Sequence, residues 1–229
     1  MPDQALFNEF VFNIEPNISG LLSSAPYGKE QYTSDLMTLS SQHSCIPHDK
    51  VSNTIGAFYA YFHPTHPFLL PRSHLSRILS ESEANPLELA MLYLGSCYIC
   101  PAQANLISEL LQKSLFRQSS RKSGYQVQAM LLFAVGLHAN GKQEYARQFL
   151  QNAIGLALEI GMHRQSWILN NPDTSELAQE SWRRTWWELY VVDGMMASST
   201  QQPCFLSRDV ASDVPLPCEE KEYIAMVCV

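Results

Sequence analysis

The feature that most constrains the fold is a helix predicted over residues 127–139 that is apolar almost all the way round. A helix without a polar face is stable only when other elements bury it on every side. Asn140-Gly141 follows it and is typical of a tight turn, because glycine readily adopts a positive φ. A second, amphipathic helix is expected over residues 142–160, with Gly161 as its stop. Its apolar stripe is predicted at Tyr145, Phe149, Ala153, Leu156 and Ile160.

These two helices predict an antiparallel hairpin with about the length of a tetratricopeptide unit. The sequence shows no second repeat at the same period, so an array is not predicted. Further helices are expected over residues 50–62, 86–99, 102–116 and 175–198. The last of these is capped by Asp173, Thr174 or Ser175. The expected fold class is therefore all-α, an irregular multi-helix bundle with a tetratricopeptide-like hairpin and essentially no sheet.

The 229 residues provide for one domain with a sizeable core. Residues 1–49 are expected to form an irregular N-terminal segment or linker, because prolines, glycines and a Ser/Thr-rich patch interrupt any periodicity. The domain is expected over residues 50–217, and residues 218–229 form a C-terminal tail. Residues 1–10 carry two acidic side chains and no basic start, so no secretory signal is predicted. No apolar run is long enough for a membrane span.

The balance of charge argues against nucleic-acid binding by this chain alone. Lys and Arg number 15 against 22 Asp and Glu, a formal net charge of −7, whereas phosphate binding needs clustered cations. Only 16% of the residues are charged, below the roughly 25% of typical soluble domains. Such a surface predicts that a partner, or a missing portion of the domain, covers part of it. We therefore expect the isolated chain to self-associate, or to be soluble only with a partner, through a surface that includes the helix at 175–198 and the segment after Pro203.

The cysteines and histidines leave two interpretations open. Cys97 and Cys100 have the spacing of a metal half-site, but their apolar surroundings favour small hydrophobic side chains in a helix core. His63, His66 and His74 lie close together and could bind zinc. With no carboxylate or cysteine within a few residues, a loop that packs aromatic and proline rings is the favoured alternative. No cofactor is therefore expected, and the unpatterned cysteines fit a reducing intracellular compartment.

Two motifs separated by an acidic spacer occupy residues 146–193. Residues 146–164 read A-R-x-x-L-x-x-A-x-x-L-A-L-E-x-G-x-H-R, and residues 183–193 read R-R-x-W-W-x-L-Y-x-x-D. The combined pattern resembles the regulatory "middle homology" domain of fungal zinc-cluster transcription factors, also called the fungal-specific transcription factor domain. The resemblance covers about residues 50–217 and implies a helical regulatory domain of a nuclear protein.

The chain departs from that family in two places. Gln201-Gln202-Pro203 stands where the family usually has a G-R-P turn, although the acidic and proline-containing segment at 207–217 matches. The six cysteines are scattered and do not form the paired halves of a zinc-cluster DNA-binding head. The chain therefore looks like the front part of a regulatory domain, and we expect no autonomous DNA binding.

The helix predicted over residues 175–198 carries the candidate site, which has two interpretations. It is either a pocket or surface for an effector or partner, or a central core helix whose Arg183 and Asp193 hold neighbouring elements together. Glu180, Arg184 and Glu188 are four apart, which predicts ion pairs on the helix surface. The candidate effector or partner surface consists of Arg183, Trp186, Trp187, Tyr190 and Asp193.

Three functions follow from these observations. The sequence contains no motif of a known enzyme class, so we assign no catalytic residue and expect no enzyme. The leading hypothesis is a transcription regulator that controls target genes, such as a metabolic gene set, from the nucleus. It would act through a protein partner or by dimerising with a full-length relative. The alternatives are a helical module that binds a small-molecule effector, and an inactive truncated fragment.

Overall fold

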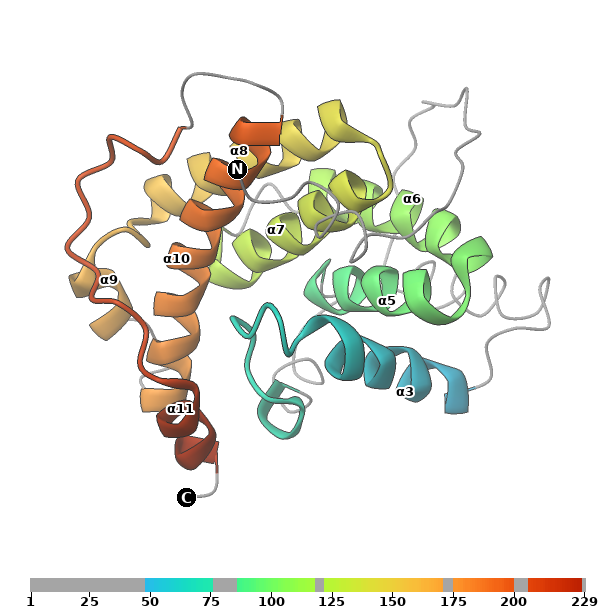
Figure 1. Cartoon of the computed structure of the whole chain (residues 1–229), viewed down its shortest axis with the longest axis horizontal. Coiled ribbons are helices and arrows are strands. Elements are labelled where there is room, and N and C mark those ends of the chain that lie inside the picture. Colours follow the sequence, from blue (N-terminus) through green and yellow to red (C-terminus); the bar gives the residue numbers. More distant parts are fainter. Residues whose placement is uncertain (1–47, 76–85, 118–121, 171–174, 200–205, 228–229) are drawn as a thin grey trace.

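A computed structural model describes residues 48–75, 86–117, 122–170, 175–199 and 206–227 (Figure 1). Within these ranges the protein is all-α and contains no strand, which confirms the expected fold class. The irregular segment predicted at 1–49 lies almost entirely outside the described residues. No helix in the described ranges has the length and apolarity to span a membrane. The helices are α3 (His48–Ala57), the π-helix η1 (Phe58–Phe62), α5 (Pro86–Ile99), α6 (Pro101–Arg117), α7 (Gly124–Ala139), α8 (Gln143–Ile160), α9 (Gln165–Leu169), α10 (Glu176–Ser199) and α11 (Glu220–Val227).

Helices α7 and α8 form the predicted hairpin. Helix α7 begins three residues earlier than expected, because the Ser123 hydroxyl accepts a hydrogen bond from the Gln126 backbone N–H and caps it. The two glycines predicted to turn the chain have φ angles of 73° at Gly141 and 87° at Gly161. After α8 the backbone N–H of Met162 donates to the carbonyl of Ala157, the closing bond of a Schellman motif.

Four of the five residues predicted for the apolar stripe of α8 pack into the core: Phe149, Ala153 and Leu156 are buried, and Ile160 is partly buried. Tyr145 was also expected to face the core, but 56% of its surface is exposed. The buried stripe begins one residue later, at Ala146. Its buried members are Ala146, Phe149, Leu150, Ala153, Ile154, Leu156 and Ala157.

A second hairpin, not predicted from the sequence, stacks on the first. Helix α5 packs against α6 and also against α7, so that two helical pairs form one layered body with α3 beside α5 (Figure 1). Two glycines allow these close approaches. A Cβ atom on Gly95 would lie 2.1 Å from the backbone oxygen of Thr54, and one on Gly136 would lie 2.4 Å from the ring of Tyr93. Helix contacts of this kind depend on small residues. They therefore leave no fixed-period pattern of large side chains in the sequence.

The first predicted helix, residues 50–62, ends in a π-helical turn. The backbone N–H of His63 donates to the carbonyl of Phe58, five residues back, at 3.0 Å. The wider turn buries Phe58 and Phe62, whose rings stack with centroids 5.3 Å apart. The residues between them include Ala60 and Tyr61, which are exposed.

Helix α10 lies beside the stacked hairpins and packs on α7, α8 and α9 (Figure 1). Ser175 caps it, since its hydroxyl accepts a hydrogen bond from the Ala178 backbone N–H at 3.2 Å. The chain then returns along α10 through residues 206–219 and ends in α11, which also packs on α10. The tail predicted at 218–229 is thus largely a packed helix, in which Tyr223 is only 1% exposed.

Candidate functional site on helix α10

The five predicted site residues separate into an inner pair and an outer group. Trp186 and Asp193 are buried, with 1% and 7% of their surfaces exposed. Arg183, Trp187 and Tyr190 are only partly buried and follow one another at the three- and four-residue spacing of one helix face. The structure therefore does not bring all five side chains to a single place.

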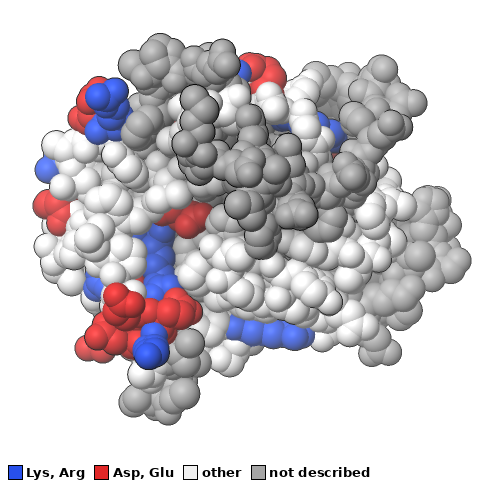
Figure 2. Space-filling model, viewed as in Figure 1, with Lys and Arg blue, Asp and Glu red and all other residues white. Residues whose placement is uncertain are grey.

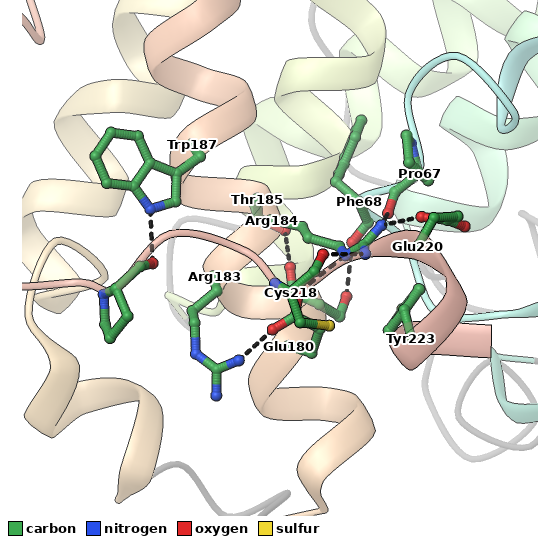
Figure 3. Close-up of polar contacts among 12 residues, drawn as sticks. Pro67, Phe68, Glu180, Arg183, Arg184, Thr185, Trp187, Cys218, Glu220 and Tyr223 are labelled. Atoms are coloured by element: carbon green, nitrogen blue, oxygen red, sulfur yellow. Dashed lines mark hydrogen bonds and ion pairs between the residues drawn. The ribbon is translucent and has the colours of Figure 1, made fainter. Parts of the chain in front are cut away.

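The buried centre of the site is Arg184, which the sequence analysis placed in a surface ion pair. Its Nε donates to Oε1 of Glu180 at 3.0 Å, and both side chains are buried. Its Nη1 donates to the backbone oxygen of Pro67 and, at 2.6 Å, to Oε2 of Glu220. Its Nη2 donates to the backbone oxygen of Cys218 at 3.1 Å (Figure 3). One guanidinium thus joins α10 to the loop at 67–69, to residues 206–219 and to α11.

The Glu180 carboxylate is fully buried and is satisfied from three directions. Besides Arg184, it accepts a hydrogen bond from the backbone N–H of Cys218 at 2.9 Å and pairs with Arg183 through its second oxygen. A buried carboxylate is strongly destabilising unless partners of this kind compensate its charge. Burial alone would lower the pKa of Arg184, but its hydrogen bonds to Glu220 and Glu180 outweigh that effect and raise the pKa. The Arg184 guanidinium therefore keeps its positive charge in this buried position.

Tyr223 of α11 covers the Arg184 guanidinium from the outside. The guanidinium carbon lies 4.1 Å from the centre of the Tyr223 ring, the geometry of a cation–π contact. The phenol donates to the backbone oxygen of Leu69 at 3.1 Å, and burial raises the pKa of Tyr223. This one aromatic side chain therefore connects α11 to both α10 and the loop at 67–69.

We call residues 206–219 the strap. The strap runs antiparallel to α10, so that its earlier residues contact the later part of the helix. The Asp193 carboxylate accepts hydrogen bonds from the backbone N–H and the hydroxyl of Ser207, at 2.7 and 2.8 Å. Further along, the Trp187 indole N–H donates to the backbone oxygen of Pro215 at 2.8 Å. The core-helix interpretation thus fits Asp193, whereas the connecting role assigned to Arg183 belongs to Arg184.

The strap also contacts α9. The Asp213 carboxylate accepts a hydrogen bond from the backbone N–H of Gln165 at 2.7 Å, at the first residue of that helix. The Ser212 hydroxyl donates to the backbone oxygen of His163 at 3.0 Å. Two polar side chains of the strap, Ser212 and Asp213, thus satisfy backbone groups next to α9.

The predicted ion pair between Arg184 and Glu188 does not form. Glu188 instead pairs with the Nδ1 atom of His66 at 2.6 Å, and the His66 ring stacks on Phe62. His63 lies against the backbone oxygen of Leu69, and burial lowers the pKa of His63. The loop thus packs its histidines on aromatic rings, as its favoured interpretation predicts. Among the described residues, no three His, Cys, Asp or Glu side chains gather as metal ligands would.

Cys97 lies in the core beside the hairpin turn. It is buried, and the amide nitrogen of Asn140 lies 3.7 Å from its sulfur. Burial raises the pKa of the Cys97 thiol to about 11. A thiol with so high a pKa is a poor source of thiolate, which suits a packed side chain better than a metal ligand.

An outer stripe of apolar side chains runs along the exposed side of α10. We define it as Trp187, Tyr190, Val191 and the strap residue Leu216. The centroids of the Trp187 and Tyr190 rings lie 5.8 Å apart, in an edge-to-face contact. Val191 is 49% exposed and Leu216 is 73% exposed. On the face shown in Figure 2, charged side chains gather mainly over α11 and leave wide areas uncharged. The outer stripe itself consists of apolar side chains that are partly or largely exposed.

The family model of the fungal specific transcription factor domain matches residues 55–225, three quarters of the chain. The chain belongs to this family. The matched range includes the strap and most of α11, so both are part of the fungal transcription factor domain and its Arg184 centre. The resemblance seen in the two sequence motifs is thereby confirmed.

Two curated relatives are similar to this chain. The C6 finger domain transcription factor iacK of Pestalotiopsis fici is 39% identical over 181 residues, 78% of this chain and 27% of that protein. Cutinase transcription factor 1 beta of Fusarium vanettenii is 26% identical over 191 residues, 74% of this chain and 20% of that protein. The chain thus spans between 20% and 27% of the length of these relatives. No solved structure matches it.

Sequence reasoning missed Arg184 and Glu180 as members of the site. Both were assigned to the helix surface, because spacing alone shows that two charges can pair and not what lies over them. A usable signal was available in the adjacent arginines of the second motif: two neighbouring residues point about 100° apart on a helix, so at most one of these arginines faces the solvent squarely.

Proposed function

We propose that this chain is the regulatory domain of a transcription regulator that acts in the nucleus through a protein partner. The observation that carries the proposal is the family match over residues 55–225, which covers η1 to α10, the end of α3 and most of α11. The names of both relatives describe transcription factors, and this supports the same broad role here. No catalytic role is part of the proposal.

The outer stripe is the partner surface in this proposal. Aromatic side chains supply much of the binding energy at protein interfaces, and charged residues are depleted at their centres. Trp187 and Tyr190 have this character, and the exposed Val191 and Leu216 enlarge the apolar area. Self-association of the isolated chain, expected from its low content of charge, would use the same surface.

We assign DNA binding to another part of the protein or to a different protein. With a net charge of −7, the chain would have to bind phosphates against its own overall repulsion. The test is an electrophoretic mobility shift with purified chain and no partner. A sequence-selective, salt-sensitive shift would contradict this part of the proposal.

A reporter assay in a fungal host tests the proposal directly. The full chain is fused to an unrelated DNA-binding module, and expression of a reporter gene is compared with that produced by the module alone. We expect the fusion to change expression, and the changes Trp187→Ala and Leu216→Ser to abolish most of the effect. Tyr145→Ala is the matched control, because Tyr145 is similarly exposed but lies on α8. Equal reporter activity for all variants at equal protein level would refute the outer stripe as the partner surface.

A second candidate function, effector binding, is favoured by one buried group. The indole N–H of Trp182 is buried without a hydrogen-bond partner among the described residues. The Trp182 ring lies 4.9 Å from that of Tyr125 and 5.8 Å from that of Trp167. A small aromatic ligand with a hydrogen-bond acceptor would satisfy this donor. Ligand-dependent thermal stabilisation, lost in Trp182→Phe, is the corresponding test.

A further inference from the structure

We infer that the surface beneath α11 is a docking site for an acidic, aromatic helix of a partner protein, and that α11 occupies this site in cis. This inference deepens the proposed function, because it adds a second partner surface to the domain. It rests on the contacts of Arg184, Glu220 and Tyr223 drawn in Figure 3.

The charges of α10 at this place call for an anionic occupant. The buried Glu180 carboxylate is paired with both Arg183 and Arg184. Within this cluster of three side chains, two positive charges against one negative charge leave a surplus of one positive charge. Glu220 supplies the balancing negative charge, with its Oε2 2.6 Å from Arg184. The whole chain has a net charge of −7, so this positive charge is a local feature. It favours a carboxylate as its partner.

The site also contains a place for one aromatic ring. Tyr223 lies over the Arg184 guanidinium and reaches the backbone oxygen of Leu69 with its hydroxyl. Glu220 and Tyr223 are three residues apart, one helical turn, so both anchors come from one side of α11. The site therefore recognises a helix that presents a carboxylate and a tyrosine one turn apart, a helix-in-groove mode of binding.

Helix α11 is short, and most of its described side chains lie in solvent. It has eight residues, too few to be a stable helix on its own. Tyr223 is its one fully buried side chain among those described, Met226 is partly buried against the core, and Glu220 is about half exposed. Its acidic neighbours Glu219 and Glu222 are also exposed. A helix that is not stable alone can be displaced by one that presents the same groups.

Removal of α11 leaves the rest of the site assembled. The Glu180 carboxylate keeps both arginines, and the strap is still attached at Asp193 through Ser207 and at Trp187 through Pro215. The vacated surface would present the Arg184 guanidinium and the Leu69 carbonyl, one cationic donor and one acceptor. These two groups are the ones that a partner helix of the stated kind requires.

The probe for this site is a fluorescent peptide with the sequence of residues 206–227, added to the full chain. Two forms of the full chain are compared, wild type and Tyr223→Ala, in which the cis occupant has lost its aromatic anchor. We expect the peptide to bind Tyr223→Ala about tenfold or more tightly than wild type, because the wild-type α11 competes for the site. Binding should weaken as salt is added, since a charge pair contributes to it.

Two controls separate recognition from non-specific binding. A peptide with both Glu220→Gln and Tyr223→Ala should lose binding to the Tyr223→Ala chain, and this control leaves the protein itself unchanged. The double variant Tyr223→Ala/Arg184→Gln should lose binding of the unmodified peptide, provided that its circular dichroism shows a folded chain. Equal peptide affinity for wild type and Tyr223→Ala would overturn the inference. So would peptide binding that does not depend on Glu220 and Tyr223 of the peptide.

The inference and the proposed function can fail separately. Peptide binding is measured without DNA or a reporter, and none of its variants touches the outer stripe. One further outcome identifies a different occupant. If wild-type chain sediments as a dimer that Tyr223→Ala converts to a monomer, a second copy of α11 takes the site, and the assignment to another protein is wrong.

Discussion

Replacing Arg184 with methionine tests the central energetic claim, that this guanidinium compensates a buried carboxylate. Methionine keeps the length and most of the volume of the arginine stem but none of its donors. The Glu180 carboxylate, which has no exposed surface, would retain only Arg183 and the Cys218 backbone N–H. The cation–π contact with Tyr223 would be lost at the same time.

The expected loss is large because the pair is buried. Removing one partner of a buried ion pair typically costs about 3–5 kcal/mol, because the remaining charge is no longer compensated. The contact with Glu220 adds little, since that carboxylate is 51% exposed and surface pairs contribute only about 0–1 kcal/mol. We therefore expect Arg184→Met to lower the free energy of unfolding by about 3–5 kcal/mol, a large share of the roughly 5–15 kcal/mol that a domain possesses.

Arg183→Met is the matched control, because it removes the same chemical group from the same carboxylate. Arg183 is partly exposed, and we expect its loss to cost about 1 kcal/mol or less. The double variant Glu180→Gln/Arg184→Met removes both charges and should recover part of the loss. Urea unfolding followed by circular dichroism and by tryptophan fluorescence measures all three. Equal losses for the two arginines would refute the claim that Arg184 is the compensating partner.

Three further predictions concern the core, the helix contacts and pH. Leu131→Asp should destabilise the chain by several kcal/mol in urea unfolding, since Leu131 is fully buried in α7 and the new charge would be unpaired. Gly95→Ala should lower the free energy of unfolding by about 1–3 kcal/mol, because the new Cβ would clash with Thr54. Gly155→Ala meets nothing within 4 Å and should raise that free energy by about 0.5–1 kcal/mol. Equal shifts of the two variants in thermal melts would contradict this. Burial lowers the pKa of His63 below its unfolded value of about 6.5, so the neutral form stabilises the fold above that pH. That contribution should be lost as the pH falls through the lowered pKa, and His63→Gln should flatten the loss in a pH series of unfolding curves.

The helices could be predicted from the sequence because their ends carry local signals. The predicted range 86–99 coincides with α5, and the stop at Gly161 follows from a left-handed φ that glycine adopts most easily. The cap at Ser175 is likewise a property of one side chain and its nearest backbone donors. Signals of this kind require no knowledge of tertiary structure.

Features that depend on distant contacts could not be predicted in this way. Tyr145 has the spacing of the buried stripe of α8 and is nevertheless exposed, because spacing does not show how far a neighbouring element covers the first turn of a helix. The contacts of Arg184 with Glu220 and of Glu180 with the Cys218 backbone join residues that lie 36 and 38 positions apart in the sequence. Periodicity shows that charges on one helix can pair, but the element that covers them decides whether the pair lies in water or in the core.

The π-helical turn at Phe58–Phe62 has a consequence for how this domain tolerates changes in length. A π-turn contains one residue more than the α-helix needs to link the same two buried positions. Deleting the exposed Ala60 would let the turn close as an ordinary α-helix, while Phe58 and Phe62 would still point to the same side. The same deletion within α7 would rotate every later core side chain of that helix by about 100°. The helix α3–η1 therefore has a built-in site at which the chain can be shortened by one residue without loss of register.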